Sequence, residues 1–194
     1  MCETRLSRIE FRTPVANHAD LCRALLGDIR GVSVVDGKFL EGCVADAVIA
    51  PTNGFGYLDT WIEGAFARRF GRRLQRTLQE RIESEFEAEI EVGHAAIVPS
   101  GDLSMPFVIV TPCTAFPGTS AGQPLVCRAL LGALRAIDAW NAADEGPAIE
   151  SVIVPDVVRM SVGWESDSVF AAVRTALEAW RLGSPRAGRR QRAA

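Results

Sequence analysis

The residues best suited to chemistry lie between Asp46 and Phe66, a segment that reads DAVIAPTNGFGYLDTWIEGAF. An apolar strand is predicted to enter a loop rich in proline, asparagine and glycine, and a helix follows directly. This order places loop N–H groups beside a helix N-terminus, an arrangement that binds anions. The segment therefore predicts a ligand site at the carboxyl end of a strand, where open α/β sheets bind their ligands.

Asn53, in the loop, and Glu63, at the start of the helix, are the candidates for a catalytic role in this segment. Each also has a structural interpretation, because asparagine is common in turns and a carboxylate is favoured in the first turn of a helix. Asp59 is equally suited to cap that helix. The candidate ligand-binding residues are Asn53, Gly54, Phe55, Gly56, Asp59 and, later in the chain, Arg159.

Arg159 belongs to a second segment, PDVVRMSVGW, which runs from Pro155 to Trp164 after a predicted strand. The segment has no glycine before Gly163, and its branched residues do not readily adopt the positive φ that an amide nest requires. Asp156 is expected to repel a phosphate. Arg159 could bind one through a charge-assisted pair, although it would also suit an ordinary surface position.

The composition describes one ordinary globular domain. The chain has 194 residues, 48% of them hydrophobic and 23% charged, and a net charge of −3. This balance argues against a nucleic-acid-binding body, which would carry a basic face. No apolar stretch approaches the ~20 residues of a membrane span and no signal peptide is apparent, so a cytoplasmic location is expected.

No cofactor or metal is expected. The five cysteines are scattered without CxxC spacing, which suits a reducing compartment. His18 and His94 lie far apart in the sequence and share no carboxylate cluster, so a zinc site is not predicted.

Strand-like and helix-like segments alternate along the chain. Continuous apolar runs in the strands predict a three-layer α/β/α sandwich with a mixed, largely parallel central sheet. Three details of the pattern are an edge strand near the N-terminus, a helix capped by Asn17, and one long amphipathic helix over 62–88. Residues 1–182 are expected to form one domain. Residues 183–194 form a basic tail, interpreted as a disordered end, with an acidic or nucleic-acid partner as the alternative.

The segment VADAVIAPTNGFG resembles the strand ending in DAIVNAAN of macro domains, the fold that binds ADP-ribose and related metabolites. IEGAF resembles the helix start VDxAI that follows it, and EVGHAAIVPSG resembles the family's VGxA strand. The proline and the NGFG turn are closer still to a divergent bacterial and phage-type variant. The resemblance implies the macro-like fold and a ligand of the ADP-ribose type.

The functional residues of the family match this chain unevenly. The resemblance aligns Asn53 with the asparagine that faces the distal ribose, and Glu63 with the acidic residue that holds water in hydrolytic members. The family's adenine-binding aspartate aligns with Lys38, and Trp61 replaces a glycine that lets the ligand approach. The glycine-rich loop that wraps the diphosphate aligns with the glycine-free stretch after Pro155.

The preferred interpretation is a divergent macro-like domain that binds an ADP-ribose-like, nucleotide or other phosphorylated ligand without catalysis. The first alternative is an ADP-ribosyl hydrolase that uses Asn53 and Glu63. The second is a protein-interaction or assembly domain with a decayed pocket, forming a homo-oligomer or binding a protein partner. Its interface would be formed by Trp61, Met160, Trp164 and Trp180.

Overall fold

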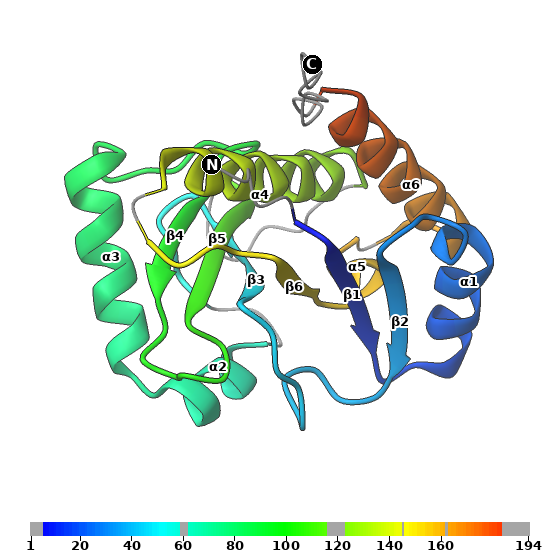
Figure 1. Cartoon of the computed structure of the whole chain (residues 1–194), viewed down its shortest axis with the longest axis horizontal. Helices are drawn as coiled ribbons and strands as arrows, with labels where there is room; N and C mark the ends of the chain where they lie inside the picture. Colours follow the sequence, from blue (N-terminus) through cyan, green and yellow to red (C-terminus); the bar gives the residue numbers. More distant parts are fainter. Residues whose placement is uncertain (1–5, 59–61, 116–122, 145, 162, 184–194) are drawn as a thin grey trace, which may run out of the picture.

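A six-stranded sheet forms the centre of the molecule, in a computed structural model that describes residues 6–58, 62–115, 123–144, 146–161 and 163–183 (Figure 1). The strand order is β2-β1-β6-β3-β5-β4, and every neighbouring pair is parallel except β4 with β5. The sheet is therefore mixed and largely parallel, as predicted. Its strands are β1 (Arg8–Thr13), β2 (Val32–Asp36), β3 (Ala47–Asn53), β4 (Ala96–Pro99), β5 (Phe107–Thr114) and β6 (Ser151–Val154).

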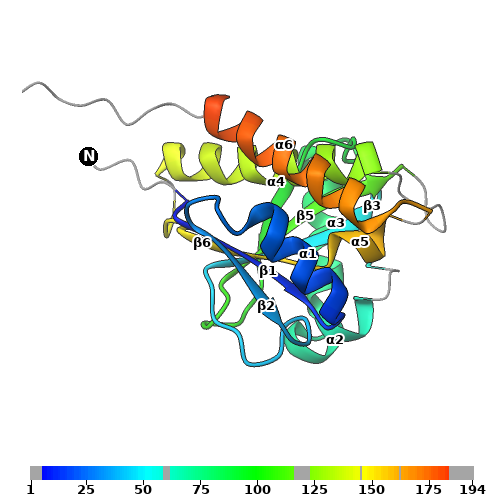
Figure 2. The ribbon, with the colours of Figure 1, turned by 90° about the vertical axis from the view of Figure 1, so that its right-hand side faces the viewer.

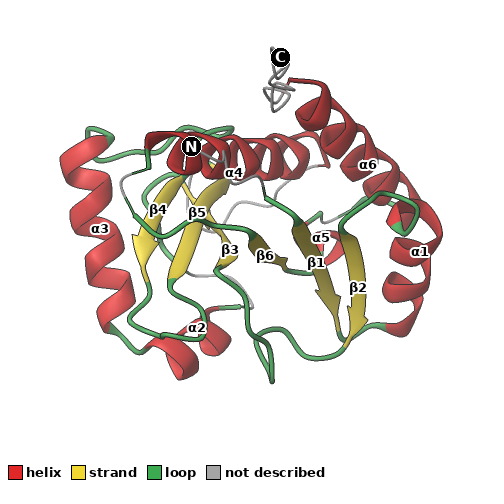
Figure 3. Ribbon diagram, in the orientation of Figure 1, coloured by secondary structure: helices red, strands yellow, loops and turns green. Residues whose placement is uncertain are grey.

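Helices cover both faces of this sheet. They are α1 (Ala16–Leu26), α2 (Glu63–Phe70), α3 (Arg73–Glu85), α4 (Gln123–Ala143), α5 (Val157–Met160) and α6 (Ser166–Gly183). One apolar core joins the sheet to α1, α4 and α6, and a second joins it to α2 and α3. In Figures 2 and 3 the helices and strands accordingly form three layers. None of the helices in the described part of the chain has the length and apolar character needed to cross a membrane.

Strand β3 shows why the sheet needs helices on both faces. All of its residues are buried. Ala47 and Ile49 pack into the core with α1, α4 and α6, whereas Val48 and Ala50 pack into the core with α2 and α3. A strand with two apolar faces is stable only when both faces are covered, as in parallel sheets generally.

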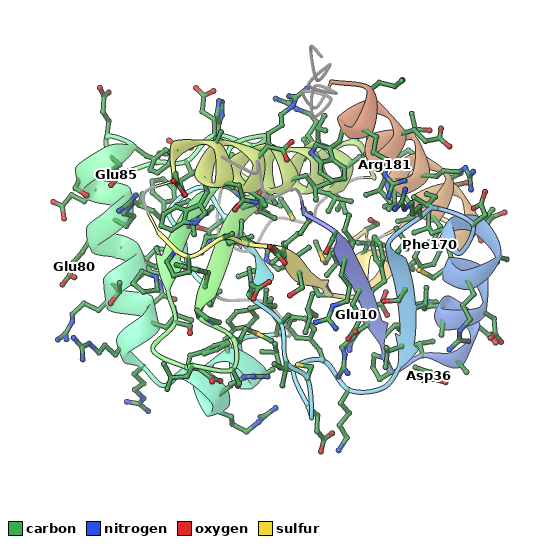
Figure 4. The ribbon with its side chains drawn as sticks, viewed as in Figure 1. Glu10, Asp36, Glu80, Glu85, Phe170 and Arg181 are labelled. Atoms are coloured by element: carbon green, nitrogen blue, oxygen red, sulfur yellow. The ribbon has the colours of Figure 1, made fainter. Side chains whose placement is uncertain are left out.

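The prediction of one long helix over 62–88 is wrong, because the chain turns at Gly71 and forms α2 and α3 separately. Gly71 has a φ of 73°, a value that glycine adopts readily, and its N–H caps α2 by donating to the Ala67 carbonyl. The apolar stripe continues across the break, since Phe66 and Leu78 are both buried. Opposite that stripe, Glu80 and Glu85 point outward from α3 (Figure 4).

The N-terminal strand and the cap of the first helix also differ from expectation. β1 is not an edge strand, because it lies between β2 and β6. Its inward residues Ile9 and Phe11 are buried in the core with α1, α4 and α6. Val15 occupies the N-cap of α1 in place of Asn17, and its N–H donates to Thr13 Oγ1 at 3.1 Å.

Candidate functional site

The loops that follow β1, β6 and β3 leave the sheet beside one another. β6 lies between the other two strands, with Val152 opposite both Ile9 of β1 and Ala47 of β3. Adjacent strands are about 4.8 Å apart, so loops from β1 and β3 begin about 10 Å apart with the β6 loop between them. This edge is where the sequence predicts a ligand site.

Asn53 ends β3 and organises the loop that follows. Its side chain is 1% exposed, and its Oδ1 accepts the N–H groups of Phe55 at 3.0 Å and Tyr57 at 3.4 Å. The Asn53 carbonyl accepts the N–H of Gly56 at 2.9 Å. These contacts are those of an asparagine-centred turn. Asn53 therefore has the structural role predicted for it, as a turn residue. Its role in binding a ligand stays a prediction.

The N–H groups of this loop are already used within the chain. Besides the three that bond to Asn53, Gly54 N–H donates to the Ala115 carbonyl at 3.2 Å, and Leu58 N–H donates to Gln75 Oε1 at 3.2 Å. Each N–H group from Gly54 to Leu58 therefore has an acceptor. The expected set of open amides is filled by the protein's own oxygen atoms in this part of the loop.

Gln75 of α3 holds the loop from the opposite side and was not predicted from the sequence. Its Nε2 donates to the Gly56 carbonyl at 2.8 Å, and its Oε1 accepts the bond from Leu58. Glycine is favoured at position 56 because its φ is 74°, and an added Cβ would lie 2.2 Å from Ile82 Cδ1 and force that side chain to shift. The second glycine of the NGFG motif, Gly56, thus lets the loop pack closely against Gln75 and Ile82 of α3.

Thr52 has a buried hydroxyl that finds no hydrogen-bond partner in the described part of the chain. The residue is 2% exposed, and Oγ1 has no hydrogen-bond partner within the described residues. A buried hydroxyl without a partner destabilises a fold by about 1–3 kcal/mol, and such a group is commonly met by an ordered water molecule. The unsatisfied oxygen lies directly before Asn53, at the predicted ligand edge.

Asp156, at the start of the β6 loop, does not face a ligand. It is 3% exposed and caps α5, with Oδ1 accepting the N–H groups of Val158 at 3.1 Å and Arg159 at 3.3 Å. Its Oδ2 accepts Thr13 Oγ1–H at 2.6 Å and lies 2.8 Å from His18 Nδ1. The carboxylate is thus buried and bonded on both oxygens, and its effect on a phosphate stays a prediction.

The bonds of Asp156 also explain how the glycine-free loop after β6 uses its N–H groups. Its first N–H groups point at an anion, and that anion is the chain's own carboxylate. The loop folds as the short helix α5, whose Val157 packs into the core. The N-cap position of Asp156 was readable from the sequence, because an aspartate directly before apolar helical residues is a common cap. Its bonds to Thr13 and His18 were not readable, since these residues lie 143 and 138 positions away.

The structure describes the side chains of only some of the remaining predicted site residues. Arg159 is exposed on α5, at the ligand edge. Glu63 is the first residue of α2, and its side chain lies outside the described set, as do Asp59 and Trp61. Lys38 is exposed and pairs with Glu41 at 3.2 Å.

Aromatic side chains at this edge are partly exposed. Tyr57, in the β3 loop, and Trp164, after the β6 loop, are each 46% exposed. Of the tryptophans proposed for a protein interface, Trp180 is instead buried, with Nε1 donating to Asp138 Oδ2 at 2.6 Å. Two aromatic faces thus remain available at the carboxyl edge.

Two cavities lie away from this edge, near the turn between β4 and β5, and were not predicted. Their volumes are about 810 Å³ and 510 Å³, and Arg69 and Asp102 line both. Arg69 donates to Asp102 Oδ2 at 2.8 Å and to the carbonyls of Leu40 and Cys43. Hydrogen bonds from Ser104 and Arg69 lower the pKa of Asp102 to about 2. The Arg69 guanidinium is therefore occupied in joining the loop before β3 to this turn.

Neither a metal cluster nor an activated thiol at Cys113 is found among the described residues. No group of three or more His, Cys, Asp or Glu side chains among them could hold a metal ion. Burial raises the pKa of Cys113, at the end of β5, to about 12. A thiol so protonated at neutral pH is a poor nucleophile.

Comparisons with known proteins agree with this architecture. The chain is similar to the macrodomain of Mycobacterium tuberculosis DarG, with 19% identity and a TM-score of 0.57, over 76% of this chain and 90% of that one. The macrodomain of Thermus aquaticus DarG gives 17% identity and a TM-score of 0.56, over 74% and 87% of the two chains. No curated protein matches by sequence. Likeness at these identities shows the fold alone. A family model described as "Macro domain" matches residues 49–169, more than half of the chain, and the chain therefore belongs to the macro domain family.

Proposed function

We propose that this protein is a divergent macro domain that binds an ADP-ribose-like, nucleotide or other phosphorylated ligand at the carboxyl edge of its sheet, without catalysis. Macro domains bind ADP-ribose, and the family membership makes this ligand class the first to test. In this proposal residues 1–182 act as one ligand-binding unit and residues 183–194 as a basic tail.

The observation that carries the proposal is the set of groups gathered at this edge. Asn53, the unsatisfied Thr52 hydroxyl and the exposed Tyr57 lie on the β3 side, while Arg159 and the exposed Trp164 lie on the β6 side. Aromatic faces can stack on a base, and a guanidinium pairs well with a phosphate. Because the neighbouring amides are already bonded, side chains would contribute more of the recognition than in a loop with open N–H groups.

The decisive experiment is calorimetric titration of the folded protein with ADP-ribose, alongside AMP and ribose 5-phosphate. Binding in the micromolar to millimolar range is expected. Absence of heat at millimolar ADP-ribose, with a cooperative thermal melt showing a folded sample, would refute the proposal for this ligand. The two fragments report which half of the ligand provides the affinity.

The variant Asn53→Asp separates the ligand role of Asn53 from its turn role. Aspartate keeps an oxygen that can accept the Phe55 and Tyr57 amides, but it loses the amide donors and adds a negative charge. Affinity for ADP-ribose should fall at least tenfold, and because the added charge is buried the melting temperature should fall as well, so binding is measured well below the melting temperature of the variant. The control is Asn17→Ala in α1, an exposed position, which should bind like the wild type.

The hydrolase alternative makes a different prediction. Asn53 and Glu63 would position a water molecule for attack on the anomeric carbon, and release of ADP-ribose from a modified protein would be measurable. Glu63→Gln should then abolish turnover without weakening the binding of ADP-ribose. A protein that binds ADP-ribose and shows no turnover supports the non-catalytic proposal.

A further inference from the structure

His18 and Asp156 form a pair that no predicted role explains. His18 lies in the first turn of α1, directly after the carboxyl end of β1, and Asp156 begins the adjacent β6 loop. His18 Nδ1 is 2.8 Å from Asp156 Oδ2. The aspartate side chain is fully buried, whereas the imidazole is 18% exposed.

The surrounding hydrogen bonds assign the hydrogen on the imidazole. Val15 N–H donates to Thr13 Oγ1 at 3.1 Å, so the Thr13 hydroxyl hydrogen is left to donate to Asp156 Oδ2 at 2.6 Å. Asp156 also accepts two backbone N–H groups on its other oxygen. A carboxylate placed among donors in this way is an acceptor, so Nδ1 carries the hydrogen that it shares with Asp156.

The second ring nitrogen then has a defined character. When Nδ1 of a neutral imidazole carries the hydrogen, Nε2 holds a lone pair and accepts hydrogen bonds. No described residue bonds to Nε2, and it is absent from the buried, unsatisfied polar atoms. An oriented acceptor is thus accessible at the carboxyl edge, one strand from the β6 loop and about 10 Å from β3.

We propose that His18 Nε2 contacts the bound ligand by accepting a hydrogen bond from one of its hydroxyl or amino groups, with Asp156 as the residue that positions the ring. This inference rests on the proposed function, since it requires a ligand at this edge. It adds a ligand class to that function: one that presents an O–H or N–H donor within reach of β1, as a ribose or a nucleobase with an exocyclic amine does. A bare phosphate has no such donor when fully ionised.

The chain provides a convenient test because it contains only two histidines. Long-range ¹H–¹⁵N correlation spectra report which ring nitrogen carries a hydrogen in each. In the free protein, His18 is expected to show hydrogen on Nδ1 and a lone pair on Nε2, and the exposed His94 serves as the internal reference. A spectrum with the neutral His18 ring protonated on Nε2 would overturn the inference.

Ligand addition and three variants complete the test. ADP-ribose should shift the Nε2 signal of His18 and not that of His94. His18→Phe should weaken binding roughly two- to tenfold, as expected for one hydrogen bond, and His94→Phe should not. Asp156→Asn keeps the imidazole but offers it an amide donor in place of a carboxylate, so the tautomer should invert and affinity should fall similarly.

The outcomes distinguish this inference from the proposed function. If ADP-ribose binds while the His18 signal and the affinity of His18→Phe stay unchanged, the inference is wrong and the proposed function stands. If the folded protein binds no ADP-ribose at millimolar concentration, the proposed function fails for that ligand and the inference falls with it. Thermal melts of all three variants show whether a loss of affinity comes from unfolding.

Discussion

Asp156 joins the two segments of the chain that flank the ligand edge, because one oxygen bonds to His18 Nδ1 at 2.8 Å and the other caps α5. A residue that the sequence suggests as a barrier to phosphate is thus a buried link between β1, α1 and the β6 loop. The anion that this loop accommodates is part of the protein. The N–H groups of Val158 and Arg159 are therefore bonded within the chain.

Asp156→Ala should lower the free energy of unfolding by about 2–4 kcal/mol, because the Thr13 hydroxyl and two N–H groups lose their acceptor. Asp156→Asn should cost less, since its amide oxygen can still cap α5. Urea denaturation followed by far-UV circular dichroism measures both. Asp20→Ala is the control, because Asp20 forms only an exposed pair with Arg23 and should contribute under 1 kcal/mol. Equal effects at Asp20 and Asp156 would contradict the buried role of Asp156.

Gly56→Ala should destabilise the protein more than Gly42→Ala. Both glycines have positive φ, 74° and 60°, and alanine is strained in either place. Only at Gly56 does the new Cβ also meet a side chain, Ile82 Cδ1 at 2.2 Å, whereas nothing lies within 4 Å at Gly42. We expect a cost of about 1 kcal/mol at Gly42 and 3 kcal/mol or more at Gly56, measured by urea denaturation. Similar losses in the free energy of unfolding at the two positions would mean that α3 shifts to accommodate the new Cβ.

Gln75→Ala should loosen the loop after β3 without unfolding the domain. The substitution removes the bonds to the Gly56 carbonyl and the Leu58 N–H. Hydrogen exchange followed by mass spectrometry should show faster exchange in a peptide covering 54–58, while peptides from β5 stay protected. Gln79→Ala, one turn further along α3, is the matched control and should leave the loop unchanged.

The hydrogen bonds that Ser104 and Arg69 donate to Asp102 make stability depend on pH in acid. The pKa of Asp102 in the folded state, about 2, lies below its ordinary value of 3.8, so its contribution is fully present above pH 4 and disappears as the pH falls toward 2. Because the carboxylate is partly exposed, we expect this contribution to be about 1 kcal/mol. Asp102→Asn should remove it at pH 6 and converge with the wild type near pH 2. A difference in melting temperature between the wild type and Asp102→Asn that stays the same at all pH values would contradict this.

Much of the fold could be predicted from local pattern. The apolar runs of β3 and β5 predict strands buried on both faces, and the amphipathic segments predict the covering helices. The break between α2 and α3 was missed because the apolar stripe continues across Gly71 at helical spacing. The internal position of β1 was missed because strand order depends on which strands pair, and the period-two pattern of one strand does not contain that information.

The sequence by itself determined the family and the alternation of strands and helices, and it predicted a ligand site at the turn that PTNGFG forms after β3. Tertiary structure alone decided what the atoms at that edge do. Hydrogen bonds between His18 and Asp156 and between Gln75 and Gly56 join residues that are distant or on separate elements. They form only when strand pairing brings those elements together. A donor and an acceptor satisfied in this way are no longer available to a ligand, and that distinction is a property of contacts rather than of residue types.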